Sequence, residues 1–138
     1  LLDVGCGSGI LSICASKLGA SYCFACDLDP VAVRVAKENI ASSGEKNIEC
    51  GTSDLLKQSK GVPGGYKVIA ANIVADIIVR LTPDVSGFLG EDGVYLLSGI
   101  VEGSAEKVLL NLAEYGYEII KEYEENGWRA YAARRKKD

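Results

Sequence analysis

Apolar positions along the chain follow two alternating spacings, which predict strands that are each followed by a helix. Short apolar runs such as residues 1–4 and 22–26 are typical of strands covered on both faces, and helical spacing of apolar residues follows each run. The predicted strands cover residues 1–4, 22–26, 47–51, 66–71 and 93–98. The predicted helices cover residues 10–18, 30–43, 73–81 and 102–115.

Residues at the expected helix ends support these boundaries. Asp29 is a favourable N-cap with Pro30 at the first helical position, and Gly44 is expected to end the same helix. The pair Thr82-Pro83 predicts an interruption after Leu81, with a second short helical piece at residues 84–88.

The last part of the chain differs, because it predicts strands without a helix between them. Residues 117–123 and 128–133 are rich in β-forming side chains, and Asn126-Gly127 between them is a strong hairpin signal. We therefore expect an α/β fold with a doubly wound, mostly parallel sheet that ends in a C-terminal antiparallel hairpin. The pattern shows no internal boundary, so residues 1–138 are expected to form one domain.

Composition narrows the possible functions. The 138 residues carry a net charge of −4, which disfavours a broad nucleic-acid surface, and the basic cluster at 134–137 is expected to be a solvated terminus. The chain has no histidine, which excludes Ser-His-Asp and Cys-His triads and HExxH zinc sites within it. No apolar run is long enough for a membrane span, so a cytoplasmic location is expected.

The five cysteines do not suggest a disulfide framework, because their number is odd and their spacing irregular. Cys23 and Cys26 have the spacing of a redox or zinc pair, but they fall in a predicted strand, where positions three apart point to opposite faces. We interpret both as core thiols, and no metal site is predicted.

The most informative motif is the glycine-rich turn after the first strand. Gly5, Gly7 and Gly9 alternate after Asp3, at the start of a predicted helix whose N-H groups could face a ligand. The dinucleotide fingerprint G-x-G-x-x-G is broken, because Ile10 occupies the place of its third glycine. This disfavours a nicotinamide-dependent oxidoreductase and leaves a nucleotide-like ligand or a turn without a ligand. The spacing resembles the first motif of the Rossmann-like S-adenosylmethionine (AdoMet) methyltransferases.

Three polar residues follow predicted strands, where ligands bind in doubly wound sheets. Asp27 lies at the distance from the turn at which an acid reaches ribose hydroxyls; the alternative is a helix-capping acid, a role that Asp29 fills better. Leu28 would then flank the adenine. Asp54 is either an acid near the adenine amino group or a plain turn residue, and Asn72 is either a site residue or a helix cap.

Longer phrases resemble one methyltransferase family. Residues 3–13, the phrase Asp27-Leu28-Asp29-Pro30, residues 71–78 with Asn-Ile-Val-Ala-Asp, and Leu97-Ser98-Gly99-Ile100 are similar to the PrmA-type ribosomal protein methyltransferases. This resemblance implies the seven-stranded sheet of AdoMet methyltransferases and transfer of methyl groups from AdoMet to amino groups of the large-subunit protein L11. Asn72-Ile73-Val74-Ala75 departs from the Asn-Pro-Pro-Tyr of many nitrogen-methylating enzymes, which disfavours methylation of DNA bases or glutamine.

The resemblance also assigns roles to single residues. Gly5, Gly7 and Gly9 would cradle AdoMet, and Asp3, Leu28 and Asp54 would also bind it. Asp27 would hold the ribose, and Asn72 would both contact the cofactor and orient the amine as the catalytic residue. The family carries a small N-terminal domain that recognises the ribosomal protein, and because Leu1 already lies in a strand we expect the chain to be truncated upstream. Alternatives are a methyltransferase for a small molecule and an AdoMet-binding fragment without activity.

Overall fold

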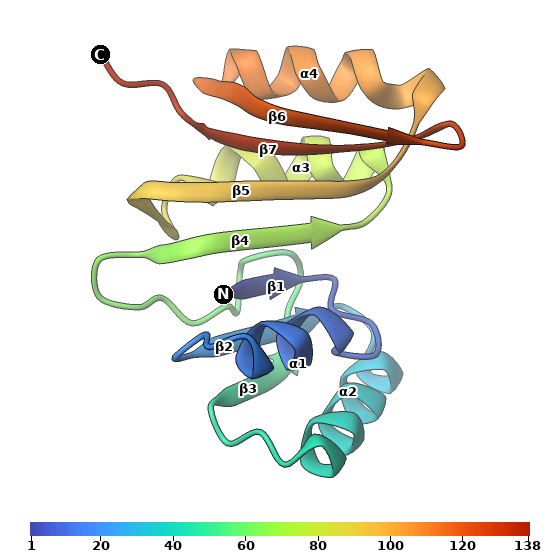
Figure 1. Cartoon of the computed structure of the whole chain (residues 1–138), viewed down its shortest axis with the longest axis vertical. Helices are drawn as coiled ribbons and strands as arrows, with labels where there is room; N and C mark the ends of the chain where they lie inside the picture. The colour runs from blue at the N-terminus through green and yellow to red at the C-terminus, as the bar shows by residue number, and fades with distance from the viewer. The chain divides into compact units, whose positions relative to one another are not determined.

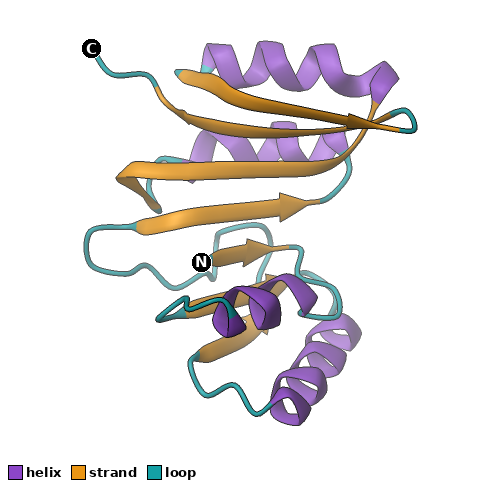
Figure 2. Cartoon of the chain, in the orientation of Figure 1, coloured by secondary structure: helices purple, strands orange, loops and turns teal.

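A computed structural model describes all residues from 1 to 138, and the chain divides into two compact units, Leu1–Gly61 and Val62–Asp138. Figure 1 follows the chain from blue to red, and Figure 2 separates its helices from its strands. The first unit contains β1 (Leu2–Val4), α1 (Ile10–Lys17), β2 (Cys23–Asp27), α2 (Pro30–Ser43) and β3 (Ile48–Thr52). The second contains β4 (Tyr66–Asn72), α3 (Ala75–Val85), β5 (Leu89–Val101), the 3-10 turn Glu102–Ser104, α4 (Ala105–Glu114), β6 (Tyr117–Glu125) and β7 (Trp128–Arg135).

The first unit is a parallel three-stranded sheet with β2 in the middle. Residues Leu2 to Val4 pair with residues 24–26 of β2, and the whole of β2 pairs in turn with β3. β2 consists of apolar residues up to its last position, Asp27, because residues 23–26 are buried, and Cys23 and Cys26 are part of this core. Both cysteines therefore occupy core positions, as predicted.

The second unit contains parallel and antiparallel strands. β4 and β5 are parallel, whereas β7 lies between β5 and β6 and is antiparallel to both, so it is the single reversed strand. Helices α3 and α4 pack against each other and against β5 and β6 respectively. Their contact with each other places both helices on the same face of this sheet, and Figure 1 shows α3 behind β5 and β7.

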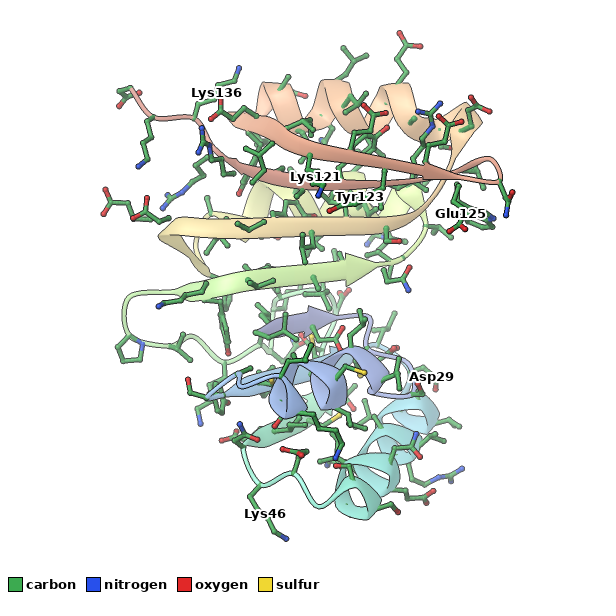
Figure 3. All side chains as sticks on the ribbon, viewed as in Figure 1. Asp29, Lys46, Lys121, Tyr123, Glu125 and Lys136 are labelled. Carbon is green, nitrogen blue, oxygen red and sulfur yellow. The ribbon has the colours of Figure 1, made fainter.

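The hairpin between β6 and β7 has the predicted two-residue turn. Asn126 and Gly127 have φ angles of 50° and 80°, the left-handed conformation that a type I′ turn requires at both central positions. Figure 3 labels Lys121 and Tyr123 on β6, where the Lys121 ammonium lies 5.0 Å from the centroid of the Tyr123 ring. The α/β fold class with seven strands, mostly parallel and closed by a C-terminal antiparallel hairpin, is confirmed.

The predicted interruption of the third helix is wrong. Helix α3 runs without a break through Pro83 to Val85, and there is no separate helix at residues 84–88. A proline inside a helix leaves the carbonyl four residues earlier without its backbone donor. Here that carbonyl belongs to Val79, and the side-chain Nδ2 of Asn111 in α4 donates to it at 3.4 Å. A neighbouring helix thus replaces the hydrogen bond that the proline removes.

Apolar spacing located helix α1 correctly but did not identify its buried face. The buried residues of α1 are Ser12 and Ser16, whereas Ile10 and Leu18 are 58% and 89% exposed. Serines can occupy the inner face because each finds a polar partner: Ser12 donates to Asp3, and Ser16 donates to Asn47. No helix of the structure is both long and apolar enough to cross a membrane.

Candidate functional site

The glycine turn joins β1 to α1 in a backbone conformation that residues other than glycine rarely adopt. Gly5, Gly7 and Gly9 have φ angles of 71°, 53° and 82°, all in the left-handed region. A Cβ atom at Gly7 would meet no atom within 4 Å, so the backbone there borders open space. A Cβ at Gly9 would lie 3.4 Å from the Cβ of Ala36, because α2 packs closely against the turn.

Backbone hydrogen bonds fix the shape of this turn. The N-H of Cys6 donates to the carbonyl of Cys26 at 2.8 Å, and the N-H of Gly9 donates to the carbonyl of Cys6 at 2.9 Å. The side chain of Asn39 in α2 donates to the carbonyl of Ser8 at 2.8 Å. The turn is therefore held from both β2 and α2 by groups of its own unit.

Asp27 at the end of β2 links the glycine turn to the start of α2. Its Oδ2 accepts from the N-H of Gly7 at 3.0 Å, and its Oδ1 accepts from the N-H of Asp29 at 3.0 Å. Asp29 caps α2, with its carboxylate accepting from the N-H of Val31 at 2.9 Å, and Figure 3 labels Asp29 where the chain enters α2. The capping role therefore belongs to Asp29, and the Asp27 carboxylate keeps lone pairs for further donors.

Asp3 lies inside the unit. It is 1% exposed, and its carboxylate accepts from the Ser12 hydroxyl at 2.9 Å. Burial raises the pKa of Asp3 to about 6; hydrogen bonds from Ser12 oppose this shift, and the negative charge of Asp27 adds to it. From this position Asp3 ties β1 to α1 on either side of the turn.

Cys6, between the first two glycines, is buried and packs with Ala25 and Ala36, and Cys50 packs against this cluster. A hydrogen bond with Cys50 and burial both raise the pKa of the Cys6 thiol. The thiol is therefore protonated at neutral pH, and Cys6 serves as a packing residue of the turn and not as a nucleophile.

The two other predicted cofactor residues of this unit lie on its surface. Leu28 follows Asp27 and is 66% exposed, which makes its side chain available to a ligand. Asp54 lies in the turn after β3, where its N-H donates to the Gln58 side chain at 2.8 Å and its carboxylate pairs with Lys57 at 2.9 Å. These contacts suit a turn residue, and they leave a role near the adenine as a prediction.

Asn72 is the last residue of β4, in the second unit, and its side chain is exposed. The alternative interpretation of Asn72 as a helix cap is wrong, because α3 begins at Ala75 and its N-cap is Val74, without a side-chain hydrogen bond. Neither the Asn72 side-chain oxygen nor the carbonyl of Ile73 accepts a hydrogen bond from the protein. Two acceptors are thus available at the carboxyl end of a parallel strand.

The polar groups around the glycine turn are of the kinds that could bind the adenosyl and methionine parts of AdoMet. The backbone at Gly7 borders open space, Gly9 begins α1 without a capping side chain, and the Asp27 carboxylate lies beside the turn. Ribose hydroxyls are donors that a carboxylate can accept, and a helix N-terminus favours electron-rich groups.

The model of one protein family, described as ribosomal protein L11 methyltransferase (PrmA), matches residues 1–136. The chain belongs to this family. A curated relative, the ribosomal protein L11 methyltransferase of Caldanaerobacter subterraneus subsp. tengcongensis, is 48% identical over 136 residues, which are 99% of this chain and 43% of the relative. The chain therefore spans less than half the length of the curated relatives that it matches.

Solved structures agree with the family assignment. The crystal structure of ribosomal protein L11 methylase from Lactobacillus delbrueckii subsp. bulgaricus matches with a TM-score of 0.93 and 36% identity, over 99% of this chain and 69% of that one. A precorrin-6y methyltransferase from Geobacter metallireducens matches with a TM-score of 0.80 at 16% identity, over 98% of this chain and 78% of that one, and shows the fold alone. The predicted PrmA-type family is confirmed.

Sequence reasoning missed residues that support the turn. Ser12 binds Asp3 from within α1, and Asn39 binds the turn from α2. Ser12 did carry a signal, since a polar residue nine positions after a buried acid can return to it across a tight turn. Asn39 carried none, because its partner is a backbone carbonyl 31 residues away.

Proposed function

We propose that the protein to which this chain belongs transfers methyl groups from AdoMet to amino groups of ribosomal protein L11. Membership of the family over residues 1–136 is the observation that carries this proposal. The chain would be its catalytic domain, and the remainder of the polypeptide would bring the ribosomal protein to it. This division of labour rests on the shorter span of the chain relative to its curated relatives.

The residues of the glycine turn would hold the cofactor. Gly5, Gly7 and Gly9 provide bare backbone, and Asp27 would accept hydrogen bonds from the ribose hydroxyls while keeping its bonds to Gly7 and Asp29. Leu28 would cover the adenine, and Asp54 would lie at its edge. Asp3 would act from the interior of the first unit, by fixing the path of the backbone through the hydrogen bond that it accepts from Ser12.

The free acceptors at the end of β4 suit a substrate amine. The side-chain oxygen of Asn72 and the carbonyl of Ile73 would each accept an N-H of a neutral amine, which fixes the direction of its lone pair. Bound AdoMet supplies a methyl group on a positively charged sulphur, so the protein has only to align and desolvate the nucleophile. The chain has no histidine, and we propose that the amine loses its proton to water before it binds.

Mass spectrometry of L11 incubated with AdoMet and the full-length protein tests the proposed function. We expect mass increases that correspond to methyl groups, located on amino groups, and their loss when Asp27→Ala is introduced. A small-molecule methyltransferase would instead bind AdoMet normally and leave L11 unmodified. If neither AdoMet binding nor methylation is detected in a folded protein, the proposal is wrong.

The isolated chain offers a second test of the same proposal. We expect it to bind AdoMet by calorimetry, because the glycine turn and its supporting hydrogen bonds lie entirely within Leu1–Gly61. We also expect it to methylate L11 far more slowly than the full-length protein, since positioning accounts for much of the rate. Equal rates would show that the remainder of the polypeptide is dispensable for substrate positioning.

A further inference from the structure

Gly99 lies in β5 beside the residues proposed to orient the amine. Its φ angle is 80°, in the left-handed region, and the pairing of β5 with β7 shifts register between Leu97 and Ile100, on either side of it. The N-H of Ile73 donates to the carbonyl of Ser98 at 3.2 Å, so the ends of β4 and β5 are joined at this point.

Two acceptor oxygens lie where a side chain at position 99 would project. A Cβ built on Gly99 would lie 2.9 Å from the carbonyl oxygen of Ile73 and 3.1 Å from the side-chain oxygen of Asn72. A separation of 2.9 Å between Cβ and oxygen is shorter than the contacts found in proteins, so an added methyl group must displace one or both oxygens. Glycine is thus required here by its neighbours as well as by its backbone angle.

We propose that Gly99 is a positioning residue for methyl transfer: the missing side chain lets the Asn72 amide and the Ile73 carbonyl occupy the places from which they accept the substrate amine. This inference rests on the proposed function. Gly99 itself touches neither substrate nor cofactor, and it acts through the two oxygens. The phrase Leu97-Ser98-Gly99-Ile100 carries part of the family resemblance, and this geometry gives its glycine a physical reason.

The same unit contains matched controls for backbone strain. Gly116, after α4, and Gly127, in the hairpin, also have φ angles of 80°, but a Cβ at either position would meet nothing within 4 Å. Substitution at these positions therefore imposes a similar conformational cost without the contact with Asn72 and Ile73. The difference between Gly99 and its controls isolates the effect of the contact.

The test compares Gly99→Ala with Gly116→Ala and Gly127→Ala in the full-length enzyme. For Gly99→Ala we expect kcat for L11 methylation to fall about tenfold to a hundredfold, with the Kd for AdoMet unchanged, since a misplacement of about 1 Å can cost that much. The controls should keep kcat within about twofold of the wild type, and their loss of thermal stability measures the cost of the backbone strain alone. A kcat for Gly99→Ala equal to that of the controls would overturn the proposal.

A second substitution covers the case in which Gly99→Ala does not fold. Asparagine tolerates the left-handed conformation better than alanine does, so Gly99→Asn relieves strain while still introducing a Cβ. We expect the same selective loss of kcat in Gly99→Asn, with Gly116→Asn as its control. Normal turnover in a folded Gly99→Asn enzyme would also overturn the proposal.

The single variant Asn72→Ala separates this inference from the proposed function. If Asn72→Ala is slow and Gly99→Ala is not, the role of Gly99 fails and that of Asn72 stands. Normal turnover in Asn72→Ala removes Asn72 from the proposed mechanism and contradicts the positioning role of Gly99 as well. An enzyme that leaves L11 unmethylated in the wild type contradicts the proposed function itself.

Discussion

The glycine turn of the first unit and the end of β4 in the second unit differ in whether their acceptors have hydrogen-bond partners within the protein. In the turn, Asp27 already accepts from Gly7 and Asp29, and the carbonyl of Ser8 accepts from Asn39. At the end of β4, the oxygens of Asn72 and Ile73 accept no hydrogen bond from the protein. One region is held by internal contacts, and the other presents free acceptors.

Under the proposed function, this contrast would correspond to two tasks, cofactor binding in the turn and substrate orientation at the end of β4. A cofactor that is bound in every catalytic cycle is best served by a rigid surface, because a preformed site loses less conformational entropy when the ligand binds. An amine that must lose a proton and align with the methyl group needs acceptors that no other group occupies. The difference leads us to expect that substitutions in the turn change affinity for AdoMet, and that substitutions at the end of β4 change turnover.

Asp27→Ala is expected to have the largest effect on cofactor binding. Hydrogen bonds to a charged group contribute roughly 1.5–3 kcal/mol, so the affinity for AdoMet should fall about 10- to 150-fold by calorimetry. Asp29→Ala is the matched control, because it removes only the cap of α2 and should cost about 1 kcal/mol of stability with little loss of affinity. An unchanged Kd in folded Asp27→Ala would remove Asp27 from the cofactor site.

Asn72→Ala should show the opposite pattern. We expect kcat for L11 methylation to fall about tenfold or more, with a much smaller change in the Kd for AdoMet, because in the proposed mechanism the amide would orient the nucleophile more than it holds the cofactor. The side chain caps no helix, so thermal stability should change little. Equal losses of affinity and turnover would instead assign Asn72 to cofactor binding, and the proposed difference between the two regions would disappear.

Asp3 provides a prediction about the pH dependence of stability. Its pKa is raised from 3.8 to about 6 in the folded protein, so the folded state binds a proton more tightly than the unfolded state does. The unfolding free energy should therefore fall as the pH rises from about 4 to about 6, by roughly 1–3 kcal/mol. This fall, measured by urea denaturation of the isolated chain, should be absent in Asp3→Asn. A parallel fall in wild type and Asp3→Asn would assign the pH dependence to other groups.

Local patterns in the sequence were sufficient for most of the fold. Asp29 and Pro30 begin α2 and Gly44 ends it, and Asn126-Gly127 forms the hairpin turn, because these residues act through their own backbone and immediate neighbours. The glycine turn could likewise be located from three residues at alternate positions. Whether Asp27 and Asn72 contact ligands could be predicted from their places after strands, and both roles stay predictions.

Contacts between distant residues could not be predicted in the same way. Ser12 is buried in α1 because it donates a hydrogen bond to Asp3 in β1. The helix therefore turns the Ser12 side toward the sheet and leaves Ile10 exposed. The crowding at Gly99 depends on two residues of the neighbouring strand end, so the sequence showed the glycine without its reason. Pro83 was expected to break the helix because a proline removes a backbone donor. The residue that replaces this donor, Asn111, lies in another helix and could not be identified from the sequence around Pro83.

That compensation leads to the prediction with the smallest expected effect, a coupling between Asn111 and Pro83. The Nδ2 of Asn111 donates to the carbonyl of Val79, which lacks a backbone donor because residue 83 is proline. In a Pro83→Ala background, the N-H of residue 83 can donate to Val79 instead. Asn111→Ala should therefore cost more stability in the wild type than in Pro83→Ala.

The size of this coupling follows from the value of one hydrogen bond. A neutral intramolecular hydrogen bond contributes about 0.5–1.5 kcal/mol, and the 3.4 Å separation of the Asn111 nitrogen and the Val79 oxygen favours the lower end of that range. A double-mutant cycle by urea denaturation of the isolated chain, with the wild type, both single variants and the double variant, measures it directly. Additive losses would mean that the Asn111 side chain does not replace the missing donor, and another cause for the continuity of α3 would then be needed.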